Sequence, residues 1–594
     1  MKRIVSALFV FIGLSAYGQN VISNQSEFDA FVKSANAGNA LSVKFMPGTY
    51  VLKSQLVTQA PLSIVGNGAT ITSPSIDLKE ESAVSETPTH YVFLHNGSIT
   101  PFSLFVDENG DIVPVSESAN SGNYVNFASK ISGTAERKAG LDITIPISPD
   151  LAHLANKSFS NTFGYFDNGW SRIDFQVLRS DRKSFYCKTL DSNNVYNFNY
   201  ERSGYSKDIR YVIYNAELKD DSVFFDSRFV YVPKRYHGVK CYACSVFETQ
   251  EPSMKICSDF NVEGVNFLGI NVIKLILDQK ESFNISNCTF EKSLGETLVI
   301  NKDCSKTSAI STITGCKFHN CALLSGSNIS LMGNNTGMTR FVIRDCYFQR
   351  YDDGKILYKN CSGLVSLTGD VDFCNNTLVN SCRSHLYLYS GRIVVSDNTI
   401  FNTAGFNSYE ARNLSSDWGL IYCGYLFDDS QKAIANKTNT ILIENCFLHG
   451  AHAYSRDARG IMIDDGRGDV TCRHNLIFDT QSYSLDSRSV PNFVGTSSIR
   501  NVIEGNVLAG SYRVVGGKEM SDSDFPAVSG NLLLGDYKNV LGPHLRKGQD
   551  DKVYPVDGEI RVDGNYMFVP KSVYRQMKRH SSFSSIKRYL KISK

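Results

Sequence analysis

One six-residue pattern recurs along the second half of the chain and limits the folds that this sequence can adopt. Each copy opens and closes with a hydrophobic residue and, except for one degenerate copy, has Cys or Asn at its fourth position. Repeats that recur every 20–50 residues or so indicate a solenoid, because each unit buries its apolar face only against its neighbours. The copies are ISNCTF (285–290), ITGCKF (313–318), IRDCYF (343–348), FCNNTL (373–378), VSDNTI (395–400), IENCFL (443–448), CRHNLI (472–477), IEGNVL (503–508) and VSGNLL (528–533), preceded by the degenerate VEGVNF (262–267).

The fourth position, called the rung position below, sets the expected fold. Coils of a parallel β-helix stack about 4.8 Å apart, so one turn recurs directly above itself. Asn tolerates a left-handed turn conformation and can bond the amide of the next coil, and Cys is a small, commonly buried side chain that fits the same niche. We therefore expect a right-handed parallel β-helix whose rung residues form one column, with mostly reduced cysteines; disulfides between rungs are the alternative. The rung residues are Cys288, Cys316, Cys346, Asn376, Asn398, Cys446, Asn475, Asn506 and Asn531.

The rest of the chain is divided around this solenoid. A charged start followed by an apolar run at 4–14 predicts a cleavable signal peptide at 1–18, and hence a secreted or periplasmic protein. First β-helix coils are expected at 19–84, an inserted β-rich domain at 85–235, and the main β-helix at 236–545. A basic tail at 546–594 is expected to cap the last coil, with contact to an anionic polymer as the alternative.

The composition gives no support to several classes of binding partner. The formal net charge is +2, which gives no reason to expect nucleic acid or membrane insertion, and we expect a monomer. Cys241 and Cys244 form a lone CxxC without a second pair at zinc spacing, so no metal site and no cofactor are predicted. The expected partner is a carbohydrate polymer or oligosaccharide.

The longest gap between repeat copies follows Asn398, and the next gap lies in the adjacent coil, so their loops should converge. The segment Trp418–Tyr422 aligns with Arg459–Ile463, and each is followed by paired carboxylates. These pairs, one coil apart, should approach within roughly 5–10 Å, the range that glycoside hydrolysis requires. They are Asp428 with Asp429, and Asp464 with Asp465.

Three segments resemble known β-helix proteins. PGTY followed by GNGATI (47–71) resembles the opening of pectate-lyase-like proteins, whereas GIMIDDGRGDVTCRHN (460–475) and RYVIYNAELKDDSVFFDSRFVYVPK (210–234) resemble β-helix glycoside hydrolases. That resemblance implies a glycoside hydrolase acting on a complex polysaccharide or oligosaccharide, with a catalytic carboxylate at Asp464 or Asp465. The part assigned to Asp428 and Asp429 is inferred from spacing alone. Turn capping or calcium binding is the alternative role for the Asp464–Asp465 pair.

Other polar and aromatic residues in the same gaps are candidate sugar contacts. Candidates for orienting hydroxyls or an acidic substituent are His452, Tyr454, Arg456 and Arg459, and Trp418 is a candidate stacking platform, with core packing as its alternative. The first four could instead serve a polysaccharide lyase, which needs a base and a cation to cleave a uronate-containing glycan. A non-catalytic glycan-binding or adhesive β-helix is the third reading.

Overall fold

The fold was analysed in a computed structural model of the whole chain. The structure describes residues 20–593 except 96–98, 100–102, 117–120, 123–139, 141, 168–171, 191–209, 215–217, 227, 244–251, 279, 303–309, 325, 334–339, 352–361, 382, 404–405, 407–417, 425–439, 453–457, 465–468, 482, 490–500, 510, 517–526, 536–550 and 557. The predicted signal peptide at 1–18 lies outside the described residues. Within them, no helix is long and apolar enough to span a bilayer.

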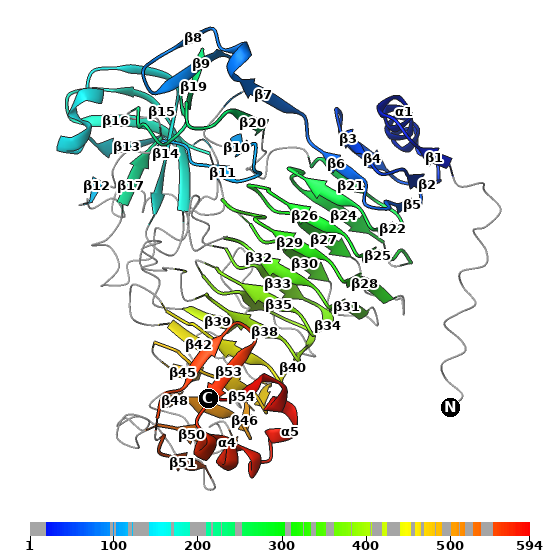
Figure 1. Cartoon of the computed structure of the whole chain (residues 1–594), viewed down its shortest axis with the longest axis vertical. Helices are drawn as coiled ribbons and strands as arrows, with labels where there is room; N and C mark the ends of the chain where they lie inside the picture. Colours follow the sequence, from blue (N-terminus) through cyan, green and yellow to red (C-terminus); the bar gives the residue numbers. More distant parts are fainter. Residues whose placement is uncertain are drawn as a thin grey trace.

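Three long parallel sheets run the length of the molecule, and the chain visits them in the same order in every coil (Figure 1). Within the described residues, sheet A has 13 strands, sheet B has 13 and sheet C has 11. Every strand pairs in parallel with the equivalent strand of the next coil, which is the topology of a parallel β-helix and confirms the predicted fold class.

The bounds of the solenoid strands are as follows. Sheet A comprises β1 (Asn20–Ile22), β2 (Leu41–Phe45), β5 (Leu62–Val65), β22 (Phe260–Glu263), β25 (Phe283–Ser286), β28 (Ile310–Thr314), β31 (Arg340–Arg344), β34 (Asp370–Cys374), β37 (Arg392–Ser396), β40 (Thr440–Glu444), β43 (Val470–Arg473), β46 (Val502–Glu504) and β49 (Ala527–Ser529). Sheet B comprises β3 (Thr49–Val51), β6 (Thr70–Thr72), β23 (Asn266–Leu268), β26 (Thr289–Glu291), β29 (Lys317–His319), β32 (Tyr347–Gln349), β35 (Thr377–Val379), β38 (Thr399–Phe401), β41 (Phe447–His449), β44 (Leu476–Ile477), β47 (Val507–Ala509), β50 (Leu532–Leu534) and β51 (Lys552–Tyr554). Sheet C comprises β4 (Leu56–Thr58), β21 (Met254–Ile256), β24 (Ile273–Leu277), β27 (Leu298–Lys302), β30 (Ile329–Gly333), β33 (Val365–Thr368), β36 (Leu386–Leu388), β39 (Trp418–Cys423), β42 (Ala458–Ile463), β45 (Tyr483–Ser489) and β48 (Ser511–Gly516).

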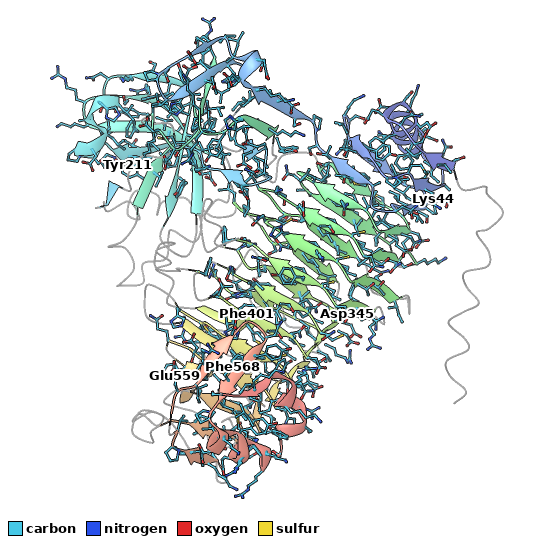
Figure 2. All side chains as sticks on the ribbon, viewed as in Figure 1. Lys44, Tyr211, Asp345, Phe401, Glu559 and Phe568 are labelled. Carbon is cyan, nitrogen blue, oxygen red and sulfur yellow. The ribbon has the colours of Figure 1, made fainter. Side chains whose placement is uncertain are left out.

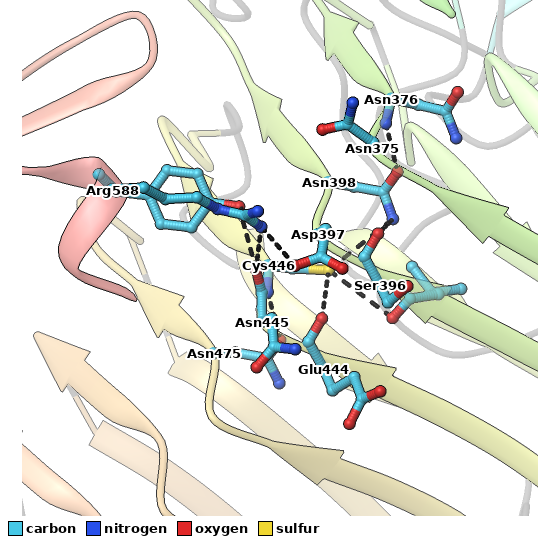
Figure 3. A network of polar contacts seen from close by, with 12 residues as sticks. Asn375, Asn376, Ser396, Asp397, Asn398, Glu444, Asn445, Cys446, Asn475 and Arg588 are labelled. Carbon is cyan, nitrogen blue, oxygen red and sulfur yellow. Dashed lines mark hydrogen bonds and ion pairs between the residues drawn. The ribbon is translucent and has the colours of Figure 1, made fainter. Parts of the chain in front are cut away.

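The rung residues lie in one column at the turn between sheets A and B. The residue after each rung donates its N–H to the carbonyl of the rung one coil earlier, as Lys317 does to Cys288 and Leu532 does to Asn506, both close to 2.9 Å. Side chains add a second set of bonds: Asn475 Oδ1 accepts from the N–H of Cys446 at 3.0 Å (Figure 3). The four rung cysteines carry free, buried thiols (Cys288, Cys316, Cys346 and Cys446).

One detail of the expected ladder is wrong. The left-handed conformation falls on the residue before each rung, where φ is +52° at Asn287, +54° at Asn375 and +57° at Asn445. The rung residue itself points inward and is buried. Position three therefore makes the turn, for which Asn, Asp and Gly are suited, while position four satisfies buried backbone groups. The column also continues one step further than the repeat, because Asp551 accepts the N–H of Asn531 at 2.8 Å.

The interior is a continuous apolar core lined by alternate residues of all three sheets. Stacked rings mark it, for example Phe290 on Phe318 with centroids 4.6 Å apart and planes 8° from parallel. The helix α1 (Gln25–Asn36) closes the first coil, since its buried residues Phe28, Phe31 and Val32 belong to the same core. Like rings at one register position recur because each coil repeats the one before it.

Antiparallel strands interrupt the solenoid between β6 and β21. They run from β7 to β20, a wider range than the expected 85–235, and the domain boundaries stay a prediction. Leu104, Val106 and Tyr242 of this insertion pack against Leu323 and Tyr351 in the turns that follow sheet B. The strands are β7 (Ser75–Lys79), β8 (Ser85–Glu86), β9 (His90–Leu94), β10 (Ser103–Asp107), β11 (Ile112–Val113), β12 (Ser121–Gly122), β13 (Asp142–Pro146), β14 (Ser158–Asp167), β15 (Arg172–Ser180), β16 (Ser184–Thr189), β17 (Arg210–Ile213), β18 (Phe224–Phe225), β19 (Phe229–Pro233) and β20 (Gly238–Ala243), with 3₁₀ turns η1 (Glu80–Ser82) and η2 (Pro149–Leu154).

The C-terminal segment folds back along the side of the solenoid (Figure 1). Its buried residues Met567, Val573 and Leu590 form one apolar cluster with Phe447 and Leu476, which project from sheet B. The expected cap over the last coil is therefore a lateral cover over several coils. The segment contains β52 (Arg561–Asp563), β53 (Tyr566–Val569), α4 (Lys571–Lys578), α5 (Phe583–Ile586), η7 (Lys587–Tyr589) and β54 (Leu590–Ile592).

Polar contacts hold this segment to the turns of the ladder. The guanidinium of Arg588 donates to Asp397 at 2.7 Å, and the Tyr589 hydroxyl donates to the carbonyl of Asn445 at 3.0 Å (Figure 3). His474 Nδ1 lies 3.0 Å from the hydroxyl of Ser582. At least one cation of the basic tail, Arg588, is thus paired with a carboxylate of the solenoid.

Candidate active site

The outer face of sheet C carries the candidate site, on three successive strands that include those of the longest gap between repeat copies and of the gap that follows it. In β36, β39 and β42 the core residues Leu386, Ile421 and Ile461 share one register position. The next residue on each strand points outward because strand side chains alternate. This outward row consists of Tyr387, Tyr422 and Met462.

The register corrects the sequence alignment by one residue. Gly419 pairs with Arg459, and Tyr422 pairs with Met462, whereas the alignment placed Tyr422 opposite Ile463. A slip of one residue exchanges the two faces of a strand, and only the observed register keeps the buried Ile421 and Ile461 together inside. Tyr422 is consequently a residue of the outer face.

Asp464 is the first residue after β42 and occupies the next outward position. Its N–H donates to the carbonyl of Cys423 at 2.9 Å, which continues the sheet C pairing by one residue. Asp464 is only 8% exposed, and the hydroxyl of Tyr422 lies 3.4 Å from its Oδ2. A carboxyl held at the edge of a sheet beside a phenol, rather than free in a loop, is a preorganised functional group.

Gly424 makes room for this contact. It follows β39 just as Asp464 follows β42, and a Cβ at Gly424 would lie 2.6 Å from Cε1 of Tyr422. No ordinary contact between carbon atoms is that short. The absence of a side chain at Gly424 therefore lets the Tyr422 ring lean along the sheet toward Asp464.

Three tyrosines form an aromatic surface beside the carboxyl. The rings of Tyr387 and Tyr422 have centroids 5.4 Å apart, and those of Tyr387 and Tyr389 are 5.9 Å apart and nearly parallel. Tyr387 is buried, whereas Tyr389 and Tyr422 are half-buried, so this surface meets solvent at the latter two. Sequence reasoning missed these residues, although Tyr387 and Tyr389 alternate with Leu388 in a way that places both on one face.

Arg459 is the second residue of β42. Its side chain is fully buried, and its Nη1 approaches Met462 Sδ at 3.6 Å. The guanidinium thus lies beside Met462, a member of the outward row, and is covered from solvent. Trp418 is the first residue of β39 and pairs with Ala458 through its backbone.

His452 lies away from Asp464. It precedes β42 whereas Asp464 follows it, and the six-residue strand between them is about 20 Å long. His452 Nε2 lies 3.0 Å from Asp479 Oδ1 in the next coil. This hydrogen bond raises the pKa of His452 and lowers that of Asp479. The expectation that His452 joins the carboxylates at one place is therefore wrong.

Five of the predicted residues lie outside the described residues: Asp428, Asp429, Tyr454, Arg456 and Asp465. The site that can be built from the described residues consists of Asp464, Tyr422, the Tyr387–Tyr389 pair and Arg459. Across the described part of the chain, no group of three or more potential metal ligands is found. The described donor set, one carboxyl with a phenol, does not by itself make a calcium site.

The chemistry open to this arrangement is acid–base and stacking chemistry. A carboxyl can move a proton or stabilise positive charge at a reacting carbon, tyrosine rings offer flat apolar faces with polar edges, and a buried guanidinium offers donors. These groups lie on the rigid strands of a solenoid, which fixes their mutual positions.

Comparisons with known proteins connect the chain to other β-helix proteins. No protein-family model matches the chain, and no curated protein matches it. A solved structure described as a glycoside hydrolase is 11% identical, with a TM-score of 0.47, covering 77% of this chain and 89% of that one. A complex of XylC with xylose is 10% identical (TM-score 0.36; 90% and 85% covered), and the tailspike gp61 of Pseudomonas phage phi297 is 13% identical (TM-score 0.25; 90% and 75% covered). At these identities the likeness concerns the fold alone.

Proposed function

We propose that this protein is a glycoside hydrolase that binds a glycan across the outer face of sheet C and uses Asp464 as one catalytic carboxyl. The observation that carries the proposal is the pairing of a nearly buried Asp464 with Tyr422 beside a tyrosine surface. The resemblance of the segment 460–475 to β-helix glycoside hydrolases points to the same residue.

Glycoside hydrolysis assigns two carboxyls to different tasks. One is protonated and gives its proton to the leaving oxygen, while the other is ionised and acts as base or nucleophile. Because Oδ2 of Asp464 accepts a hydrogen bond from the Tyr422 hydroxyl, we propose the second task for Asp464. Asp465, Asp428 and Asp429 remain the proposed sources of the acid.

The neighbouring residues would hold the sugar. Half-buried tyrosine rings are suited to stack on the apolar face of a pyranose, and Tyr389 and Tyr422 are so placed. Arg459, whose side chain is fully buried, would support this surface from behind through its contact with Met462. Export guided by residues 1–18, to the periplasm or outside the cell, belongs to this proposal because polymeric glycans are met there.

A polysaccharide lyase is the second candidate, because the phenol of Tyr422 lies on the outer face beside Asp464. A phenol can serve as the base, and a guanidinium can neutralise a uronate carboxylate. The two candidates differ in their products, because β-elimination leaves an unsaturated sugar that absorbs in the near ultraviolet and hydrolysis does not.

The test is a screen of purified protein on plant, animal and algal glycans, which reads reducing ends and near-ultraviolet absorbance on the same samples. New reducing ends without absorbance, lost in Asp464→Asn, support the hydrolase. Near-ultraviolet absorbance that persists in Asp464→Asn and is lost in Tyr422→Phe would support the lyase instead of the hydrolase. Binding of a glycan without any product, unchanged in Asp464→Asn, supports a non-catalytic binding protein instead.

A further inference from the structure

The C-terminal sheet of β52, β53 and β54 has a second, exposed face that the proposed catalysis does not use. Met567, Val569 and Leu590 point into the cluster against sheet B and are buried. Residues that alternate with them therefore point outward. Arg561, Phe568 and Lys591 are successive partners across this face, so they form one row over the three strands.

A groove of about 990 Å³ lies over this row. Its lining combines aromatic, apolar and charged groups, and Figure 2 labels two of them, Glu559 and Phe568, on the C-terminal segment. Such a mixture of a flat ring with a few charged groups is typical of sites for small polar ligands or glycan units. The lining includes Glu559, Arg561, Phe568, Pro570, Lys591 and Ile592.

Both cations of the row lie over aromatic rings. The guanidinium carbon of Arg561 is 4.8 Å from the centroid of the Phe568 ring, and Lys591 Nζ is 4.4 Å from that of Tyr566. Tyr566 is 41% exposed. Among the ion pairs of the described residues, none involves Arg561 or Lys591, whereas Arg588 of the same segment is paired with Asp397. The charge of these two residues is thus available to a ligand.

We propose that this face is an accessory binding site for an acidic polysaccharide, with a uronic acid unit over Phe568 and its carboxylate between Arg561 and Lys591. A sugar face stacks on an aromatic ring, and a carboxylate accepts hydrogen bonds from both cations. Among the described residues that line the groove, the one carboxyl, Glu559, is outnumbered by the two cations and can accept from sugar hydroxyls.

Charge favours this ligand over nucleic acid. Nucleic-acid sites have broad basic stripes that contact many phosphates, whereas this groove has two cations beside a carboxyl and the whole chain has a net charge of +2. The site covers sheet B and the candidate active site lies on sheet C, so the two would act separately. The failure of one proposal leaves the other standing.

Affinity electrophoresis of the full-length mature protein through polygalacturonate or alginate, with dextran as the neutral polymer, tests the proposal. The double variant Arg561→Gln/Lys591→Gln should bind about tenfold more weakly, a loss that two charge-assisted contacts can explain. Phe568→Leu, which keeps an apolar side chain but removes the ring, should weaken binding while it leaves thermal melting unchanged.

The matched control is Arg575→Gln/Lys578→Gln, which removes the same charge from the exposed side of α4. Retained polysaccharide binding in this control and in Asp464→Asn supports a specific binding site at Arg561, Phe568 and Lys591 that is independent of catalysis. Equal weakening in the control, equal retardation by single-stranded DNA, or no retardation of the wild type would overturn the proposal. Self-association that depends on Arg561 and Lys591 without polysaccharide binding would overturn it as well.

Discussion

The hydroxyl of Tyr422 lies 3.4 Å from Oδ2 of Asp464, although the two residues are 42 positions apart in the chain. The β-helix creates this proximity because consecutive coils align equivalent residues on adjacent, paired strands. Tyr422 in β39 and Asp464 after β42 are therefore neighbours in space. Gly424, the nearest neighbour of Asp464 in the preceding coil, leaves the space that the Tyr422 ring fills. The contact depends on three residues from two coils, and each can be changed separately.

Replacement of Asp464 by Asn is expected to abolish turnover and leave the fold intact. Asn keeps the size of the side chain but cannot act as a base or nucleophile, so the rate should fall by about a thousandfold, within the range that positioned acid–base groups contribute. Initial rates on the substrate found by the screen, with thermal melting of the same preparations, provide the measurement.

Asp278→Asn is the matched control for this variant. Asp278 is the first residue after β24, as Asp464 is after β42, but it is exposed. The control should retain the wild-type rate. If Asp464→Asn keeps near-normal turnover while it remains folded, the catalytic assignment fails.

A methyl group at position 424 should disturb the site through Tyr422. In Gly424→Ala the new Cβ would meet Cε1 of Tyr422 at 2.6 Å, so the ring must move and its contact with Asp464 is lost. We expect kcat to fall about tenfold or more, because misplacement by an ångström or so near the chemistry is that costly. In a Tyr422→Ala background the same substitution should have no further effect on kcat. An equal loss of kcat in both backgrounds would show that Gly424→Ala does not act through the Tyr422 ring.

The sequence predicted the solenoid because its repeat records the period of the coils directly. Copies such as ISNCTF and IEGNVL place a rung residue, an inward strand residue and a turn residue at fixed offsets, so the column from Cys288 to Asn531 followed. Asp551 was not predicted because the sequence before it lacks the opening hydrophobic residue of the repeat and has Asp in place of Asn or Cys. Its carboxylate nevertheless accepts the N–H of Asn531 as an Asn side chain would.

The candidate site was harder to predict because it depends on register. A pattern of apolar residues permits two alignments of β39 with β42, and the structure selects the one that keeps Ile421 and Ile461 inside. That choice brought Tyr422 to the outer face. The lateral docking of the tail through Arg588 and Tyr589 is a contact between segments far apart in the chain, which no local pattern records.

Substitution of a rung asparagine should destabilise the solenoid more than that of an ordinary asparagine. Asn506 is fully buried, accepts the N–H of Asn475 at 3.0 Å and donates to the carbonyl of Cys472 at 3.0 Å. Asn506→Ala leaves the buried N–H of Asn475 without this acceptor and removes one bond to the Cys472 carbonyl, which should lower the free energy of unfolding by about 2 kcal/mol.

Chemical denaturation of the variant measures this loss. Asn506→Cys should be milder, since Cys serves at other rungs, and the half-buried Asn266, whose amide makes one 3.3 Å bond to Gly68, should tolerate Ala within about 1 kcal/mol. Equal losses at positions 506 and 266 would contradict the special role of the column.

The rung cysteines should be unreactive until the protein unfolds. The Cys288 thiol lowers the pKa of Cys316, but the Cys346 thiol and burial together raise it to about 12, and burial raises the pKa of Cys446 to about 12. Since the thiolate is the reactive form, iodoacetamide at about pH 8 should label neither in the native state and both in denaturant without reductant. Peptide mapping by mass spectrometry would detect the labels, and a disulfide at Cys288, Cys316, Cys346 or Cys446 in denaturant would contradict the reduced ladder.

The pair of His452 and Asp479 should stabilise the fold only within a window of pH. The folded pKa of His452 is raised from 6.5, so its contribution is complete below 6.5 and disappears as pH rises through the raised value. The folded pKa of Asp479 is lowered from 3.8, so its contribution is complete above 3.8 and disappears as pH falls through the lowered value. Asp479→Asn keeps a residue that tolerates the φ of +51° at this position. The variant should lower the melting temperature slightly at about pH 5.5 but not at about pH 9. Both side chains are more than a third exposed, so the effect should shrink further in high salt. An equal loss at both pH values would mean that the pair acts through packing and not through charge.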